Sequence, residues 1–146
     1  MLKEQLASDL KEAMKAKDEI RKNVVQMVRA GVLQVEKDKR ITLDDEGVIE
    51  VIAKEVKKRK DVLPDFEKAG RTDLIEATQR EIEILLSYLP SQLTADELDK
   101  TVSETVKEVG ASTMKDMGKV MSALMPKVKG RADGKAVNEL VKKYLS

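Results

Sequence analysis

The sequence predicts an all-α fold, with an N-terminal helical domain followed by a small C-terminal domain of three helices. Apolar residues make up 41% of the 146 residues and aromatic residues only 2%. The apolar set is therefore mainly Leu, Val, Ile, Met and Ala, which suits helix packing better than sheet pairing. These residues recur at steps of three and four, the period of an amphipathic helix, and no run alternates for long enough to predict a strand.

The first stretch predicts a helical hairpin. Apolar residues at steps of four run from Leu2 to Met14, and after a break at Asp18 a valine series runs from Val24 to Val35. Capping and stop signals then place two further helices. Thr42, with an acid three residues on, is expected to cap the third helix, and Pro64 is expected to bend or end it.

The fourth helix and the domain boundary follow from similar signals. Gly70 suits a left-handed C-terminal cap, Thr72 opens the fourth helix and Pro90 ends it. Thr94 and Glu97 then form a capping box for the next helix, so the linker is expected at residues 89–94. The predicted domains are residues 1–93 and 94–146.

Three short helices are expected in the C-terminal domain. The first ends at Gly110, the second is capped by Ser112 or Thr113 and ends before Pro126, and the third is capped by Asp133. Projected at about 100° per residue, the second and third helices each gather apolar residues on one side and show lysines on the other.

The composition removes most kinds of catalytic site. The chain has no cysteine and no histidine, which excludes disulfides, thiolate nucleophiles, Cys/His zinc sites and imidazole bases. It also lacks a Gly-x-Ser-x-Gly nucleophile elbow. Asp44, Asp45 and Glu46 have the chemistry of a Mg²⁺ site, but acids are common at a helix N-terminus for the helix dipole alone. We expect no catalytic residue, no cofactor and no metal site.

The location follows from the lack of targeting signals. No window approaches eighteen consecutive apolar residues, and the N-terminal stretch "MLKEQLASDLKEAMKAKDE" carries acids and lacks the apolar segment of a signal peptide. The sequence therefore predicts a cytoplasmic protein with no membrane contact.

Charge is distributed unevenly along a chain whose formal net charge is only +1. Residues 111–146 hold eight Lys/Arg against three Asp/Glu, a net +5, so residues 1–110 carry a net −4. The segment "KVKGRADGK" at residues 127–135 concentrates four of the cations. It is not a nucleotide-binding P-loop, because only three residues separate its glycines, Ala136 follows the lysine and no strand precedes it. A glycine-containing loop before a helix N-terminus still suits a phosphate group.

Two other patterns leave alternatives open. Met114, Met117, Met121 and Met125 have the spacing of a buried helix face, which favours core packing over an adaptable partner-binding surface. The run "KKRKD" at residues 57–61 points in several directions around a helix and contains the pair Glu55–Arg59, so a solvated face is favoured over a nucleic-acid patch.

Three segments resemble the YqeY family: "MKAKDEIRKNVV", "EIEILLSYLPSQL" and above all "DMGKVMSALMPKVKGRADGKAVNELV". The resemblance covers the whole chain. Over about residues 95–146 the tail is also similar to the C-terminal domain of GatB, the B subunit of aspartyl/glutamyl-tRNA amidotransferase. The resemblance implies a helical N-terminal domain, a three-helix tail, and tRNA contact through that tail. By position it implies contacts from Lys119, Lys127, Lys129, Arg131 and Lys135, and the outer helix faces add Lys115 and Lys142.

The expected function is a non-catalytic tRNA-binding accessory protein that contacts the phosphate backbone through its basic tail. The resemblance does not extend to catalysis, because the amidotransferase uses a separate amidase subunit and the catalytic part of GatB. With only one Phe and two Tyr, base stacking is not expected either. The expected partners are tRNA and a tRNA-modifying or aminoacylating enzyme. The alternatives are a subunit or accessory of a carbon–nitrogen ligase with glutamine as amido-N donor, and a protein-interaction adaptor.

Overall fold

The computed structural model describes residues 1–146, all in helices and their connections, and the all-α prediction is confirmed. The chain forms two compact units, Met1–Leu89 and Pro90–Ser146. Residues 90–93 thus lie in the second unit rather than at the end of the first. One reason is that the backbone N–H of Leu93 donates to the carbonyl oxygen of Arg131 at 2.8 Å.

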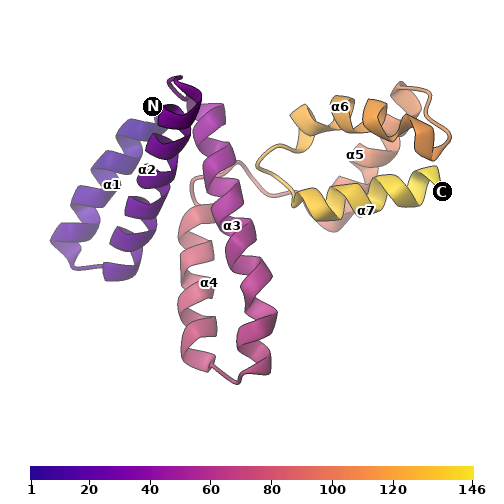
Figure 1. Ribbon diagram of the computed structural model, residues 1–146. Helices are drawn as coiled ribbons and strands as arrows, with labels where there is room; N and C mark the ends of the chain where they lie inside the picture. Colours follow the sequence, from indigo (N-terminus) through magenta and orange to yellow (C-terminus); the bar gives the residue numbers. More distant parts are fainter. The chain divides into compact units, whose positions relative to one another are not determined.

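Two helical hairpins make up the first unit (Figure 1). Its helices are α1 (Leu2–Ala16), α2 (Glu19–Lys39), α3 (Asp45–Lys68) and α4 (Thr72–Leu86). The predicted first hairpin is confirmed: α1 ends at Lys17 in the left-handed conformation, and the Asp18 carboxylate caps α2 by accepting from the N–H of Arg21. Helix α2 contacts the other three helices, and both α2 and α3 supply the valines of the core.

A close approach between α2 and α3 depends on one glycine. A Cβ at Gly31 would lie 3.0 Å from a methyl group of Val51. A side chain at Gly31 would therefore push the two helices apart at a point where Val28, Val32 and Ile52 are almost completely buried.

Two expectations about α3 are wrong. The cap is Asp44, whose side chain accepts from the N–H of Gly47 at 2.9 Å, and not Thr42. Pro64 does not end the helix, which continues to Lys68, because Pro64 is exposed and Leu63 beside it packs on the core. The other signals are confirmed: Gly70 has φ +67° and α4 begins at Thr72.

A buried cation corrects the expectation that "KKRKD" is a solvated face. Lys57, Lys58 and Lys60 are exposed, but Arg59 is only 7% exposed. Its guanidinium bonds to the Glu55 carboxylate at 2.7 Å, as the i, i+4 spacing predicts, and to the Glu81 carboxylate of α4 at 2.9 Å. This network joins α3 to α4 inside the first unit.

The second unit contains α5 (Ala95–Glu108), a short 3₁₀ helix η1 (Met114–Asp116), α6 (Met117–Val128) and α7 (Gly134–Leu145). The Thr94–Glu97 capping box and the Asp133 cap of α7 are confirmed, and Gly110 has φ +66°. Helix α6 runs two residues past Pro126, which is exposed in its last turn.

The core of the second unit is built from branched aliphatic side chains. Val120, Leu124, Val137 and Val141 are completely buried. The predicted methionine face is only partly right, because Met117 and Met121 are half-buried at the edge of this core, whereas Met114 and Met125 are exposed. No helix of the protein is both long and apolar enough to cross a membrane.

Candidate nucleic-acid interface

The basic segment between α6 and α7 is held in place by hydrogen bonds. Gly130 takes φ +72°, which lets the chain reverse, and the N–H of Arg131 donates to the carbonyl oxygen of Val128 at 2.8 Å. The Gln92 side-chain amide donates to the carbonyl oxygen of Gly130 at 2.7 Å. Together with the bond from Leu93 to Arg131, these contacts fasten the turn to residues 90–93.

Two of the predicted RNA-contacting cations make contacts within the second unit. The Lys127 ammonium lies 2.8 Å from the Glu108 carboxylate and 3.0 Å from the Thr105 hydroxyl, both on α5. The Arg131 guanidinium donates from Nε to the carbonyl oxygen of Ser91 at 2.9 Å. These two side chains stabilise the unit, so they are less available to a ligand than their positions in the sequence indicate.

Four other cations of the set are exposed: Lys115, Lys119, Lys135 and Lys142. None of them takes part in an ion pair within 4 Å. Lys129 is half-buried at the C-terminal cap of α6, where its N–H donates to the carbonyl oxygen of Met125.

The seven cations form two groups rather than one patch. Helices α6 and α7 run antiparallel (Figure 1), so residues 127–135 lie at the end where the helices connect, while Lys115, Lys119 and Lys142 lie toward the other end. Lys119 and Lys127 are eight residues apart on α6, and Lys135 and Lys142 are seven apart on α7, so the two groups are separated by about 10–12 Å along the helices. A ligand that contacts both groups must therefore be an extended polyanion.

An acid near each group has a pKa below its ordinary value. Backbone N–H groups of Ser112 and Thr113 donate to the Asp116 carboxylate and hold its pKa below the usual value, and the charge of Lys119 adds to this. The hydroxyl and backbone N–H of Thr94 lower the pKa of Glu97, with a smaller contribution from Arg131. These carboxylates reduce the positive potential around Lys119 and Arg131 but do not touch Lys135 or Lys142.

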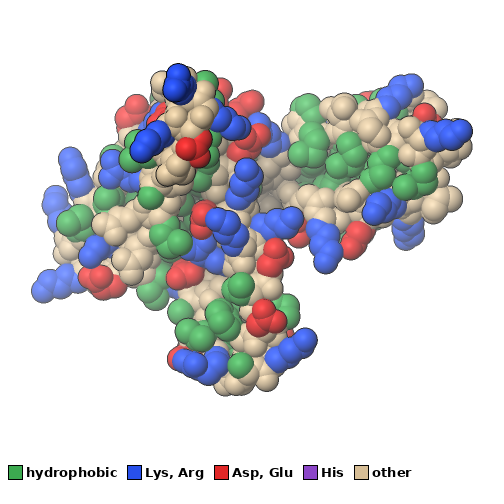
Figure 2. All heavy atoms as spheres, viewed as in Figure 1, with side chains coloured by type: hydrophobic (Ala, Val, Ile, Leu, Met, Phe, Trp, Pro, Cys, Tyr) green, Lys and Arg blue, Asp and Glu red, His purple; other side chains and the backbone are tan.

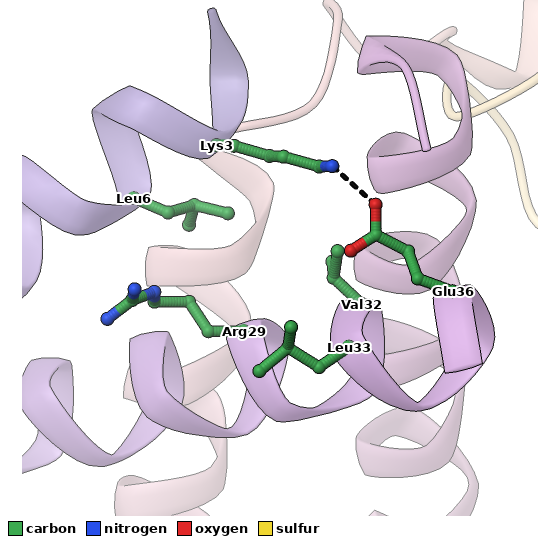
Figure 3. A pocket seen from close by; sticks show the side chains of 6 residues that line it. All are labelled: Lys3, Leu6, Arg29, Val32, Leu33 and Glu36. Atoms are coloured by element: carbon green, nitrogen blue, oxygen red, sulfur yellow. Dashed lines mark hydrogen bonds and ion pairs between the residues drawn. The ribbon is translucent and has the colours of Figure 1, made fainter. Parts of the chain in front are cut away.

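The structure offers few other sites. A pocket of about 120 Å³ lies between α1 and α2, where the ion pair between Lys3 and Glu36 closes one end and Leu6, Val32 and Leu33 form the apolar wall (Figure 3). It is smaller than typical ligand pockets of about 300–1,000 Å³. No group of three or more acidic side chains is arranged to hold a metal ion.

The sequence is matched by one family model over nearly its whole length. The model is described as Yqey-like protein and covers residues 3–145. The chain belongs to the YqeY family.

Curated relatives share the name "Altered inheritance of mitochondria protein 41, mitochondrial". The protein from Pyrenophora tritici-repentis is 30% identical over 132 residues, which cover 87% of this chain and 71% of the relative. The protein from Lachancea thermotolerans is 36% identical over 110 residues, covering 73% and 59%. The protein from Saccharomyces cerevisiae strain YJM789 is 30% identical over 109 residues, covering 71% and 56%. This YqeY chain thus spans between about half and two thirds of the length of most of these relatives.

The relatives overturn the expectation of a cytoplasmic protein. They are named as mitochondrial proteins. The expectation rested on the lack of a long apolar run and of a secretory signal peptide, and neither observation distinguishes the cytoplasm from the mitochondrion.

Sequence reasoning missed the residues that hold the basic turn in place. Ser91 and Gln92 bind it through a carbonyl oxygen and a side-chain amide, and Glu108 pairs with Lys127 from 19 residues away. No local pattern marks such contacts. The capping signals at Thr94 and Asp133 were readable because they act within three residues.

Proposed function

We propose that this YqeY protein is a non-catalytic tRNA-binding accessory protein that contacts the phosphate backbone through its second unit. The proposal is supported by the resemblance of the tail to the C-terminal domain of GatB. It agrees with a chain that lacks the imidazole and thiol groups most enzymes use. The partner enzyme would be one that modifies or aminoacylates tRNA, including a carbon–nitrogen ligase with glutamine as amido-N donor.

The observation that carries the proposal is the set of exposed lysines on α6 and α7 and on η1 before them. Lys115, Lys135 and Lys142 have no carboxylate partner, so a phosphate can approach them without displacing an internal ion pair. Phosphates on one polynucleotide strand repeat at regular spacing, which suits cations in two groups about 10–12 Å apart.

The expected affinity is low. If three or four lysines each neutralise one phosphate, the slope of log K against log salt is about −2 to −4, and contacts of this kind give Kd values near 10⁻⁴ to 10⁻⁶ M. Such a protein acts best when it is bound to a partner that recognises the tRNA specifically and so raises the effective concentration of tRNA near the lysines.

The test compares two triple variants with the same change in net charge. One carries Lys119→Gln, Lys135→Gln and Lys142→Gln on the second unit, and the control carries Lys11→Gln, Lys57→Gln and Lys60→Gln on exposed positions of the first. Titration with unmodified tRNA at several salt concentrations gives the slope of log K against log salt for each protein. The magnitude of this slope should fall by about 2–3 in the first variant and should stay at the wild-type value in the control. Equal slopes for the two variants, or wild-type binding without salt dependence, would contradict the proposal.

A further inference from the structure

Two contacts with α5 fix which sides of α6 and α7 face each other. Lys127 on α6 reaches Glu108 of α5, and the Tyr144 hydroxyl on α7 donates to the Asp99 carboxylate of α5 at 2.8 Å. Those two flanks therefore turn toward α5. The opposite flanks of α6 and α7 must meet on the side of the unit away from α5.

On α6 this opposite flank carries methionines and a glycine. At about 100° per residue, Gly118, Met121 and Met125 share one row at i, i+3 and i+7. Met114 precedes this row on η1, which contacts both α6 and α7. We call Met114, Gly118, Met121 and Met125 the methionine strip. Figure 2 shows hydrophobic side chains gathered between α6 and α7 on the face in view.

The strip is more apolar and more exposed than the fold of the unit requires. Met114 and Met125 are 46% and 44% exposed, although Val120 and Leu124 already fill the core. Gly118 is equally unexplained: its φ is not positive, and a Cβ there would meet no atom within 4 Å. Glycine lowers helix stability relative to alanine, and the packing inside the unit does not require it at this position. The close approach of another chain would account for it.

The charges beside the strip are cationic. On α7 the flank that faces it carries Lys135 and Lys142, both exposed and without an ion pair. Four nearby acids are engaged elsewhere: Asp99 and Glu108 contact Tyr144 and Lys127 on the α5 side, Asp116 accepts from the N–H groups of Ser112 and Thr113, and Asp133 caps α7. Glu139 is exposed at i+4 from Lys135 and i−3 from Lys142, so it offsets part of their charge and leaves this side of α7 with a net positive charge. An occupant with acidic side chains beside an apolar row would complement this surface.

We propose that the methionine strip is a docking surface for an amphipathic helix of a protein partner, with an apolar row on the strip and acidic residues beside Lys135 and Lys142. Unbranched methionine side chains adapt to the apolar row, and Gly118 lets the two helix backbones come close. This surface goes beyond RNA binding, and it does not depend on it.

The test uses methionine-methyl NMR of the full chain, in the absence of RNA. The probe is a synthetic helical peptide of about 18 residues with Leu at i, i+3, i+4 and i+7 and Glu on both flanks, and its control has Lys in place of Glu. The seven methionines include an internal control, because Met14 and Met27 of the first unit are 56% and 50% exposed. The Glu peptide should shift the signals of Met114, Met121 and Met125 and leave those of Met14 and Met27 in place.

Single substitutions separate docking from loss of folding. Gly118→Ala should leave the unfolding temperature unchanged or raise it, because alanine favours the helix. It should weaken binding of the Glu peptide about fivefold or more, because the added methyl group blocks the close approach of the two helices. Met125→Gln should weaken it to a similar extent, whereas the matched control Met14→Gln should have no effect.

Three results would overturn this proposal: no methyl shift at millimolar peptide, equal shifts with the Glu and Lys peptides, or shifts that include Met14 and Met27. Failure of tRNA to bind would count against the proposed function and would leave the peptide result standing.

Discussion

Arg59 in the first unit and Lys127 in the second are both cations paired with a helix carboxylate, but their surroundings differ. The Arg59 side chain is 9% exposed and bonds to carboxylates of α3 and α4. The Lys127 side chain is 37% exposed and its partner Glu108 is 60% exposed. The same pairing is therefore part of the interior in one unit and part of the surface in the other.

The contrast extends to the rest of each unit. In the first unit the Tyr88 hydroxyl bonds to Asp9, and burial together with this bond raises the pKa of Tyr88. In the second unit the buried side chains are aliphatic apart from Thr105, and its lysines and acids all lie outside the buried core. Buried charges in the first unit thus fix how α3 and α4 pack, whereas the second unit buries no charged residue and leaves Lys135 and Lys142 without an ion pair.

The largest effect is expected from Arg59→Met. The substitution leaves the Glu55 carboxylate buried with only Lys58, 3.4 Å away, as a partner. We expect the free energy of unfolding to fall by about 3 kcal/mol, near the lower end for a broken buried ion pair. Urea unfolding followed by circular dichroism measures this change.

Two further variants control this experiment. Lys57→Met changes the neighbouring but exposed cation and should stay within about 0.5 kcal/mol of wild type. The double variant Glu55→Gln with Arg59→Met removes the stranded charge and should recover part of the loss. A loss below about 1 kcal/mol for Arg59→Met would show that the network contributes little to stability.

The sequence predicted most of the fold because its signals are local. Apolar spacing, the cap at Asp133 and the left-handed glycines Gly70 and Gly110 act within one or two helical turns. One error came where tertiary packing overrode a local rule. Pro64 usually ends a helix, yet α3 continues past it because Leu63 beside the proline packs on the core.

The candidate site was less predictable. Sequence places Lys127 and Arg131 with the other cations, but only the fold shows that Glu108 and the Ser91 carbonyl oxygen bind them. Similarly, the methionine spacing predicts a face without telling which residues of that face are covered. Val120 and Leu124 are covered, whereas Met125 is not.

A smaller effect is expected from a pair of variants in the second unit. Lys127→Gln should lower the free energy of unfolding by up to about 1 kcal/mol, since the ion pair to Glu108 lies at the surface. Lys135→Gln removes the same charge from an exposed position and should leave stability unchanged. It should, however, weaken tRNA binding more than Lys127→Gln does. Thermal unfolding and tRNA titration of both proteins check this, and the reverse ranking in tRNA binding would contradict the division between internal and exposed cations.

The smallest effect concerns a partly exposed charge of the first unit. The Lys3 ammonium and the N–H of Leu43 donate to the Glu36 carboxylate and lower its pKa. A lowered pKa in the folded state contributes stability above the pKa of a free glutamate, about 4.3, and this contribution is lost as pH falls through the lower folded value. Glu36→Gln should therefore unfold at a lower temperature than wild type at pH 7, and the difference should shrink between about pH 5 and pH 3. Glu12→Gln, at an exposed position of α1 without an ion pair, should show no such pH dependence. A Glu36→Gln difference that stays constant down to pH 3 would mean that shape, and not charge, accounts for the role of Glu36 in the first unit.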